Sequence, residues 1–250
     1  MWLLENNIAR LDTDELSAKV DMLRPGDGIH DLVVRDFKLP GTRLLRVLSP
    51  LHERKQEQLF ESYARGRDLI ATYSPTLDCP LRPQICWRVR DFQTKSSDCT
   101  GWEFIVSMQT SLLDSDASVT VATDLDADEV WRLADIHRAE FEKIEERDPS
   151  GQQIDPCNGT SVVLFRTTQP DLSYVEIVQP SEFHDSKLFS NTPQDTRVTW
   201  SRKLFRNERL EKGVIRRTRI WGFFVPHRYD LQSAFNCWQE LQGISPPLTA

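Results

Sequence analysis

Short apolar runs, separated by Pro, Gly or Asp, fill most of the chain between residues 30 and 226. They are rich in Val, Ile, Phe, Trp and Tyr, the residue types that suit a pleated and half-buried surface. Examples are "HDLVVRDF", "DLIATY", "QICWRVRDF", "WEFIVSMQTSLL", "TSVVLFRTTQ", "LSYVEIVQP" and "TRVTWSRKLF". We identify two strand-rich stretches, at about 30–122 and 160–226. Because no regular helices alternate with these strands, the pattern predicts antiparallel sheets, most simply a β-sandwich.

The chain of 250 residues is long enough to bury a substantial core, and its twelve Phe and seven Trp argue against disorder. We therefore predict a mainly β protein in which residues 1–250 form one domain, with a few peripheral helices. Its strand texture is similar to that of the large sandwiches of galactose-mutarotase-like proteins. This resemblance concerns the architecture, so it implies a fold and assigns no site residues.

Three segments have helical spacing. A helix is predicted at about 126–148, between the two strand-rich stretches, because its apolar residues recur every three or four positions and Asp126 with Glu129 forms a capping pair. A second helix is predicted at about 230–242, with its apolar residues on one side. A short helix is also predicted between Asp12 and the Pro-Gly pair at 25–26.

Residues 53–73 fit two structures. A helix over 53–65 that ends at Gly66 fits by propensity. A hairpin with its turn at 65–68 and a return strand over 69–73 fits by alternation. We favour the hairpin because strands surround it.

Charge is distributed unevenly along the chain. The net charge is −7, which argues against nucleic acid as a partner, since phosphate binding rests on Lys and Arg. Residues 202–219 carry eight basic and two acidic side chains, whereas residues 114–148 carry twelve acidic and four basic ones. Two surfaces of opposite charge could meet between subunits, so the pattern also allows a homo-oligomer.

Other features concern location and cofactors. The five Cys are irregularly spaced, the first ten residues lack a secretory pattern, and no apolar run is long enough to span a membrane. We predict a soluble cytoplasmic protein with reduced thiols and no membrane partner. The alternating acids Asp124, Asp126 and Asp128 lack the glycine of a calcium loop, because Glu129 stands there. No zinc, nucleotide or phosphate motif is complete, so no metal and no cofactor are predicted.

Acid-base chemistry needs only two titratable groups, which can be far apart in sequence. Glu176 is the first candidate, because Tyr174 shares its strand face and a ring beside a carboxylate suits a sugar. Glu211 is a second candidate acid or base. His184 and His227 could exchange protons near neutral pH. These four residues are predicted as catalytic, although a half-exposed strand glutamate and two loop histidines are also an ordinary structural arrangement.

The stretch "LEKGVIRRTRIWGFFVPHR", residues 210–228, mixes basic and aromatic residues. Alternation places Val214, Arg216, Thr218, Ile220, Gly222 and Phe224 on one face of a strand, and Ile215, Arg217, Arg219, Trp221, Phe223 and Val225 on the other. Each face begins basic and ends apolar, which predicts a strand whose first half is exposed and whose second half enters the core. Arg216, Arg217 and Arg219, together with Tyr174, are the predicted ligand-binding residues.

These observations favour a protein that binds a carbohydrate or another polyhydroxylated or anionic small molecule. One alternative is a sugar-modifying enzyme, an epimerase or mutarotase, that uses a Glu and His pair. Another alternative is an interaction or self-assembling protein that uses its oppositely charged surfaces.

Overall fold

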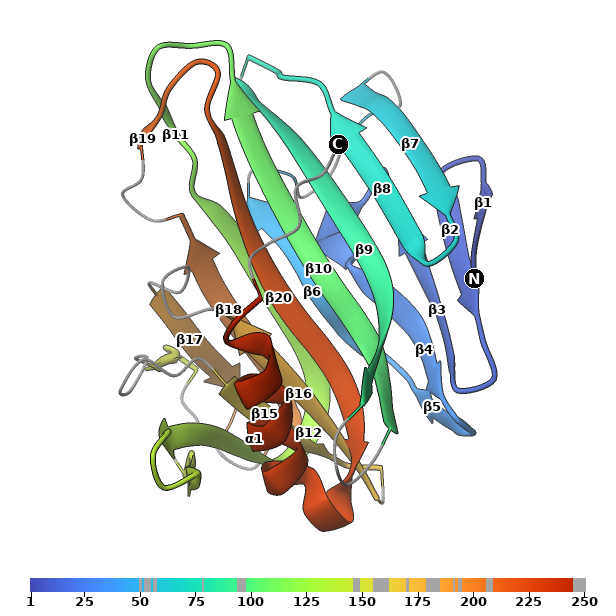
Figure 1. Cartoon of the computed structure of the whole chain (residues 1–250), viewed down its shortest axis with the longest axis vertical. Coiled ribbons are helices and arrows are strands. Elements are labelled where there is room, and N and C mark those ends of the chain that lie inside the picture. The colour runs from blue at the N-terminus through green and yellow to red at the C-terminus, as the bar shows by residue number, and fades with distance from the viewer. Residues whose placement is uncertain are drawn as a thin grey trace.

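The structure is a computed structural model. It describes residues 1–49, 51, 55, 58–77, 79–93, 98–145, 149–154, 162–169, 171–178, 185–190, 192, 195–205 and 209–244. Antiparallel strands dominate this part of the chain, and its α-helix, α1, packs against one sheet (Figure 1). None of the helices in the described ranges is long and apolar enough to cross a bilayer.

The strands of the first half are β1 (Trp2–Glu5), β2 (Ile8–Asp12), β3 (Leu16–Asp21), β4 (Ile29–Val34), β5 (Phe37–Leu39), β6 (Arg43–Ser49), β7 (Leu59–Arg65), β8 (Asp68–Tyr73), β9 (Leu81–Gln93) and β10 (Asp98–Thr110). Those of the second half are β11 (Ser115–Asp116), β12 (Val119–Asp135), β13 (Glu140–Lys143), β14 (Gln152–Gln153), β15 (Val162–Thr167), β16 (Leu172–Val178), β17 (Asp185–Ser190), β18 (Arg197–Leu204), β19 (Arg209–Leu210) and β20 (Ile215–Pro226). The helical elements are η1 (Pro25–Asp27), η5 (His227–Tyr229) and α1 (Asp230–Leu241).

Two antiparallel sheets form a sandwich. The first sheet runs in the order β1-β2-β3-β4-β6-β12-β18-β17-β14, with β5 beside β4. The second sheet runs in the order β7-β8-β9-β10-β20-β16-β15-β12-β13. Strand β12 belongs to both, because its residues up to Asp126 pair with β18 and those from Ala127 pair with β15. The predicted mainly β sandwich is confirmed.

The main core lies between the two sheets. Trp87, Trp102 and Trp200 are fully buried in it, as strand residues that point inward from β9, β10 and β18. A second apolar cluster lies on the outer face of the second sheet, where α1 covers β20, β16 and β15 (Figure 1). The predicted C-terminal helix is therefore confirmed. The main core draws on strands from β1 to β20. That residues 1–250 form one domain stays a prediction.

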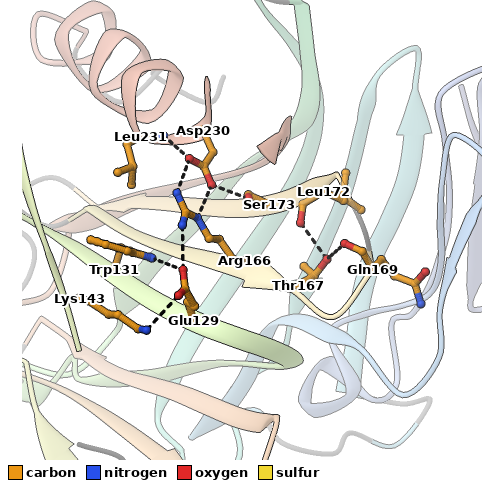
Figure 2. A network of polar contacts seen from close by, with 10 residues as sticks. All are labelled: Glu129, Trp131, Lys143, Arg166, Thr167, Gln169, Leu172, Ser173, Asp230 and Leu231. Atoms are coloured by element: carbon orange, nitrogen blue, oxygen red, sulfur yellow. Dashed lines mark hydrogen bonds and ion pairs between the residues drawn. The ribbon is translucent and has the colours of Figure 1, made fainter. Parts of the chain in front are cut away.

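The N-terminus of α1 is held by a polar network (Figure 2). Asp230, which begins the helix, accepts hydrogen bonds from Arg166 Nε and from the Ser173 hydroxyl at 2.9 and 2.8 Å. The same guanidinium donates to Glu129 at 2.8 Å, and Lys143 donates to the other oxygen of Glu129 at 2.9 Å. Strands β12, β13 and β15 are thus tied to the helix by paired charges, and β16 by the Ser173 hydroxyl.

The helix predicted at 126–148 is wrong. Residues up to Asp135 continue strand β12, residues 136–139 form a turn, and β13 returns antiparallel to it. Residues 146–148 lie outside the described part of the chain. Pairing on both edges of β12 outweighs the helical propensity of this acidic segment, because each ladder hydrogen bond and cross-strand ion pair depends on the extended backbone.

The short helix predicted after Asp12 is also wrong, because Leu16–Asp21 forms β3 with an alternating burial pattern. The hairpin is confirmed, with β7 and β8 joined at Gly66, whose φ of 61° suits glycine. The alternation predicted for residues 214–225 is confirmed in β20. Its first residues are exposed and its later residues are buried in the two apolar clusters.

Candidate functional site

Tyr174 and Glu176 lie on one face of β16, as the sequence predicts. The Tyr174 hydroxyl donates to Glu176 Oε1 at 3.0 Å, and the Thr123 hydroxyl of β12 donates to the same oxygen. Arg202 of β18 forms an ion pair with Glu176 Oε2. Tyr174, Glu176 and the Arg202 side chain have no exposed surface, so this group is an internal bridge between the two sheets.

Burial sets the electrostatics of this bridge. Loss of hydration raises the pKa of the Glu176 carboxyl, although Arg202 and two hydroxyl donors oppose that shift. Burial likewise raises the pKa of Tyr174 well above its ordinary value. The same desolvation lowers the pKa of Arg202, against the pull of the carboxylate. This group presents no surface to a ligand in the structure. The roles predicted for Tyr174 in binding and for Glu176 in catalysis stay predictions.

The other predicted acid-base residues are dispersed. Glu211 is exposed in the turn before β20, and His227 is half-buried just after the end of that strand. Glu176 lies opposite Gly222 on β20. Gly222 precedes His227 by five residues, so about 17 Å of extended chain separates His227 from the position of Glu176. The structure therefore does not bring either carboxylate to His227, and His184 lies outside the described residues.

The three predicted arginines of β20 have different surroundings. Arg216 is exposed, and it lies on the same face of β20 as Ile220, which is part of the main core. Arg217 lies on the outer face, where its Nε donates to the Ser107 hydroxyl at 3.2 Å. Arg219 is completely buried, and its Nη1 donates to Glu103 Oε1 at 2.9 Å.

Glu103 is the centre of a charged cluster on the outer face. Besides Arg219, it binds Arg90 at 2.9 Å and Arg88 at 3.3 Å, although its own side chain is almost fully buried. Arg88 also donates two hydrogen bonds to Asp68, at 2.6 and 2.9 Å, and these raise the pKa of Arg88 above its ordinary value. The Glu103 carboxylate is thus occupied by guanidinium groups of its own sheet, and the cluster is a rigid part of the sheet surface.

Beyond this cluster, polar side chains cross the outer face in register. Neighbouring strands pair Glu61 with Thr72, Thr72 with Gln84, Gln84 with Ser107, and Ser107 with Arg217. We call these five residues the polar row. Gln84 Nε2 donates to the Thr72 hydroxyl at 3.0 Å, and Arg217 donates to Ser107, so four of the five side chains are held in hydrogen-bonded pairs.

The polar row forms the floor of a hollow of about 220 Å³. Arg82, Gln109 and Ile215, which lie one step further along β9, β10 and β20, also line it. The Arg82 guanidinium lies 4.2 Å from the ring centre of Phe60 on β7, which orients it through a cation–π contact. The hollow therefore combines amide, hydroxyl and guanidinium donors with one carboxylate acceptor. We take it as the candidate binding site.

A metal role has no support in the described residues, because no group of three His, Cys, Asp or Glu side chains there could hold an ion. Of the predicted ligand-binding residues, Arg217 lines the hollow. Glu61, Thr72, Gln84 and Ser107 were missed from the sequence. Their signal was the alternation of polar and apolar residues in each strand, which identifies an exposed face, but the interstrand register that aligns them is not visible in the sequence.

No protein-family model matches the sequence, and no curated protein was found to be similar to it. Solved structures with a similar backbone do exist. A galactose mutarotase related enzyme from Lactobacillus acidophilus has a TM-score of 0.55 at 9% identity, over 87% of this chain and 96% of that protein. A candidate mutarotase from Salmonella typhimurium has a TM-score of 0.56 at 8% identity, over 91% of this chain and 96% of that protein.

The fold is a galactose-mutarotase-like β-sandwich. The architecture expected from the strand texture is thereby confirmed. At identities of 8% and 9% the likeness concerns the path of the backbone. A shared fold does not by itself assign a function, which depends on the side chains of a site.

Proposed function

We propose that the protein binds a carbohydrate in the outer-face hollow. The observation that carries the proposal is the polar row, in which amide, hydroxyl, guanidinium and carboxylate groups face one surface from five adjacent strands. Sugar hydroxyls both donate and accept hydrogen bonds, so they match a surface that offers both kinds of partner. Because the row lies on strands and is cross-linked in pairs, it loses little conformational freedom when a ligand binds.

Charge in the hollow favours a ligand that carries an acidic group. Arg82 and Arg217 place two positive charges there, against the single carboxylate of Glu61. A guanidinium can bind a carboxylate or a phosphate through two parallel hydrogen bonds that opposite charge strengthens, and neutral hydroxyls lack that charge. An acidic or phosphorylated sugar therefore fits the hollow better than a neutral one.

The two structurally similar proteins support a sugar ligand at the level of the fold, since the name of one refers to galactose and both names refer to mutarotases. We propose binding rather than sugar isomerisation as the activity. The described residues that line the hollow include one carboxylate, Glu61, and no histidine, so they do not supply the predicted Glu and His pair.

The test is thermal stabilisation by a panel of neutral, acidic and phosphorylated monosaccharides and oligosaccharides. A ligand present at one hundred times its Kd stabilises the folded state by about 2.7 kcal/mol, which raises the melting temperature measurably. We expect stabilisation by at least one acidic sugar. A flat response over the whole panel would refute the proposal.

Substitution tests the location of the site. Arg217→Ala should weaken binding at least tenfold, because it removes a guanidinium from the hollow. Arg216→Ala is the matched control, since it removes the same charge one residue earlier, from the opposite face of β20. Equal losses in the two variants would place the ligand elsewhere.

A further inference from the structure

We infer that the ligand is a linear oligosaccharide of about four units that lies across the strands, rather than a single sugar. This inference rests on the proposed function, because it concerns the size and direction of the ligand in the same hollow. It starts from the length of the polar row. The row begins at Glu61 on β7 and ends at Arg217 on β20, with β8, β9 and β10 between them.

Five strands enclose four interstrand spacings, which gives a length of about 19 Å from one end of the row to the other. Each pyranose unit of an extended chain adds roughly one such spacing, about 5 Å. A monosaccharide would contact the side chains of only two neighbouring strands. A chain of about four units would reach all five side chains of the polar row.

The shape of the hollow agrees with a chain that lies on the surface. Its volume of about 220 Å³ is distributed over residues from all five strands. Enclosed pockets for small molecules usually have about 300–1,000 Å³ and surround their ligand. A hollow of this volume that extends over five strands can contact one side of a longer chain along its whole length.

The two ends of the polar row differ in charge, which gives the chain a direction. At the β7 end the exposed Glu61 carboxylate is offset by the Arg82 guanidinium, which lies over Phe60, whereas Arg217 is half-buried and fixed on Ser107 at the β20 end. A balanced charge at one end and a positive charge at the other favour one orientation of an acidic ligand over the reverse orientation. The acidic group of the ligand is therefore expected at the β20 end, with hydroxyl groups donating to Glu61 at the other.

The experiment is a titration by calorimetry with oligosaccharides of one to six units that carry a single uronic acid, at one end of the chain. We expect the affinity to rise at least tenfold between one and four units and then to level off, as the row is filled. If the single uronic acid unit binds as tightly as the tetramer, the inference about length fails while carbohydrate binding stands. If neither these sugars nor any member of the thermal-shift panel binds, the proposed function fails as well.

A variant at the far end of the row tests the same point independently. Glu61→Ala should lower the affinity for the tetramer at least threefold more than the affinity for the monomer, because the monomer occupies the Arg217 end. Ser62→Ala is the matched control, since it is the next residue of β7 and lies on the other face. A tetramer affinity that is unaffected by Glu61→Ala would overturn the inference.

Discussion

Gly222 of β20 has no room for a side chain. A Cβ atom placed there would lie 2.2 Å from the Tyr174 hydroxyl oxygen, so that ring has to move if alanine replaces the glycine. We expect Gly222→Ala to destabilise the protein by about 1–3 kcal/mol, measured by urea unfolding. The added substitution Tyr174→Phe removes the clashing oxygen and should recover part of that loss.

Gly243→Ala is the control for this pair. Within the described part of the chain, no atom lies within 4 Å of the position that a Cβ would take at Gly243, so its cost should be close to zero. If Tyr174→Phe adds its own cost in full to that of Gly222→Ala, the hydroxyl is not what excludes the methyl group. That result would contradict the packing described for β16 and β20.

The buried ion pair between Glu176 and Arg202 leads to a second prediction. Glu176→Gln leaves the Arg202 guanidinium buried without its counter-charge, which should cost about 3–5 kcal/mol of unfolding free energy. Glu176→Gln combined with Arg202→Met removes both charges and should be more stable than the single variant. A single variant within about 0.5 kcal/mol of the parent protein would show that the pair is not a closed buried contact.

At the residue scale, alternation along a strand was enough to predict that Tyr174 and Glu176 share a face, and that Arg217 and Arg219 share another. It could not predict that Arg202 neutralises Glu176 or that Glu103 neutralises Arg219. Those partners come from strands far apart in the sequence, and only the packed sheets bring them together. A lone charged residue in an otherwise apolar strand, such as Glu103, was the available signal of a buried partner.

At the scale of elements, the polar network at the start of α1 predicts a pH dependence. Hydrogen bonding from Lys143, followed by that from Arg166, lowers the pKa of Glu129 to about 2, from an ordinary value of 4.5. A lowered pKa in the folded state stabilises the protein fully above 4.5, and this stabilisation is lost as the pH falls toward 2. With screening taken into account, Glu129→Gln should cost about 1–2 kcal/mol at neutral pH.

The measurement is urea unfolding of the parent protein and Glu129→Gln at several pH values from 7 down to about 2.5, a range that covers most of the interval between 4.5 and 2 in which this stabilisation is lost. The difference between them should shrink as the pH falls through this range. Glu142→Gln serves as the control. The Glu142 side chain is 56% exposed and pairs with Arg132 across β12 and β13. Its substitution should therefore lower the free energy of unfolding by only about a few tenths of a kcal/mol. A difference that is constant with pH would contradict the ion-pair origin of the effect.

Element prediction succeeded where one periodicity dominated and failed where two competed. The hairpin of β7 and β8 and the helix α1 each show a single clear pattern. In residues 126–144, Val130 faces the main core and Leu133 faces the outer cluster. The register of β12 shifts against β15 before Val130 and against β13 after Leu133. Each such irregularity inserts an extra residue into the two-residue alternation of the strand. The apolar residues are then spaced three or four apart, as they are in a helix.

At the scale of the whole molecule, β12 should make unfolding cooperative. One continuous strand of 17 residues supplies ladder hydrogen bonds to both sheets, so neither sheet can separate without breaking pairs in the other. We expect tryptophan fluorescence and far-UV circular dichroism to report the same urea midpoint. Two separate midpoints would show that the sheets unfold independently in spite of this strand.

The charged regions found in the sequence are partly neutralised inside the molecule. Within the basic region, Arg202 and Arg219 are buried against carboxylates, and Arg209 pairs with Asp114 from the acidic region. Fewer charges than the sequence suggests are therefore available at the surface for a partner. Assembly of subunits through opposite charges stays a prediction, as does the cytoplasmic location.

On β8, β9 and β10 the polar row alternates with residues of the main core. On β9 and β10, Gln84 and Ser107 stand beside the inward-facing Ile85 and Val106. The surface that contacts a ligand and the interior that sets the fold therefore occupy odd and even positions of the same segments. Ligand preference can change in evolution by substitutions at every second residue, while the scaffold beneath keeps its packing.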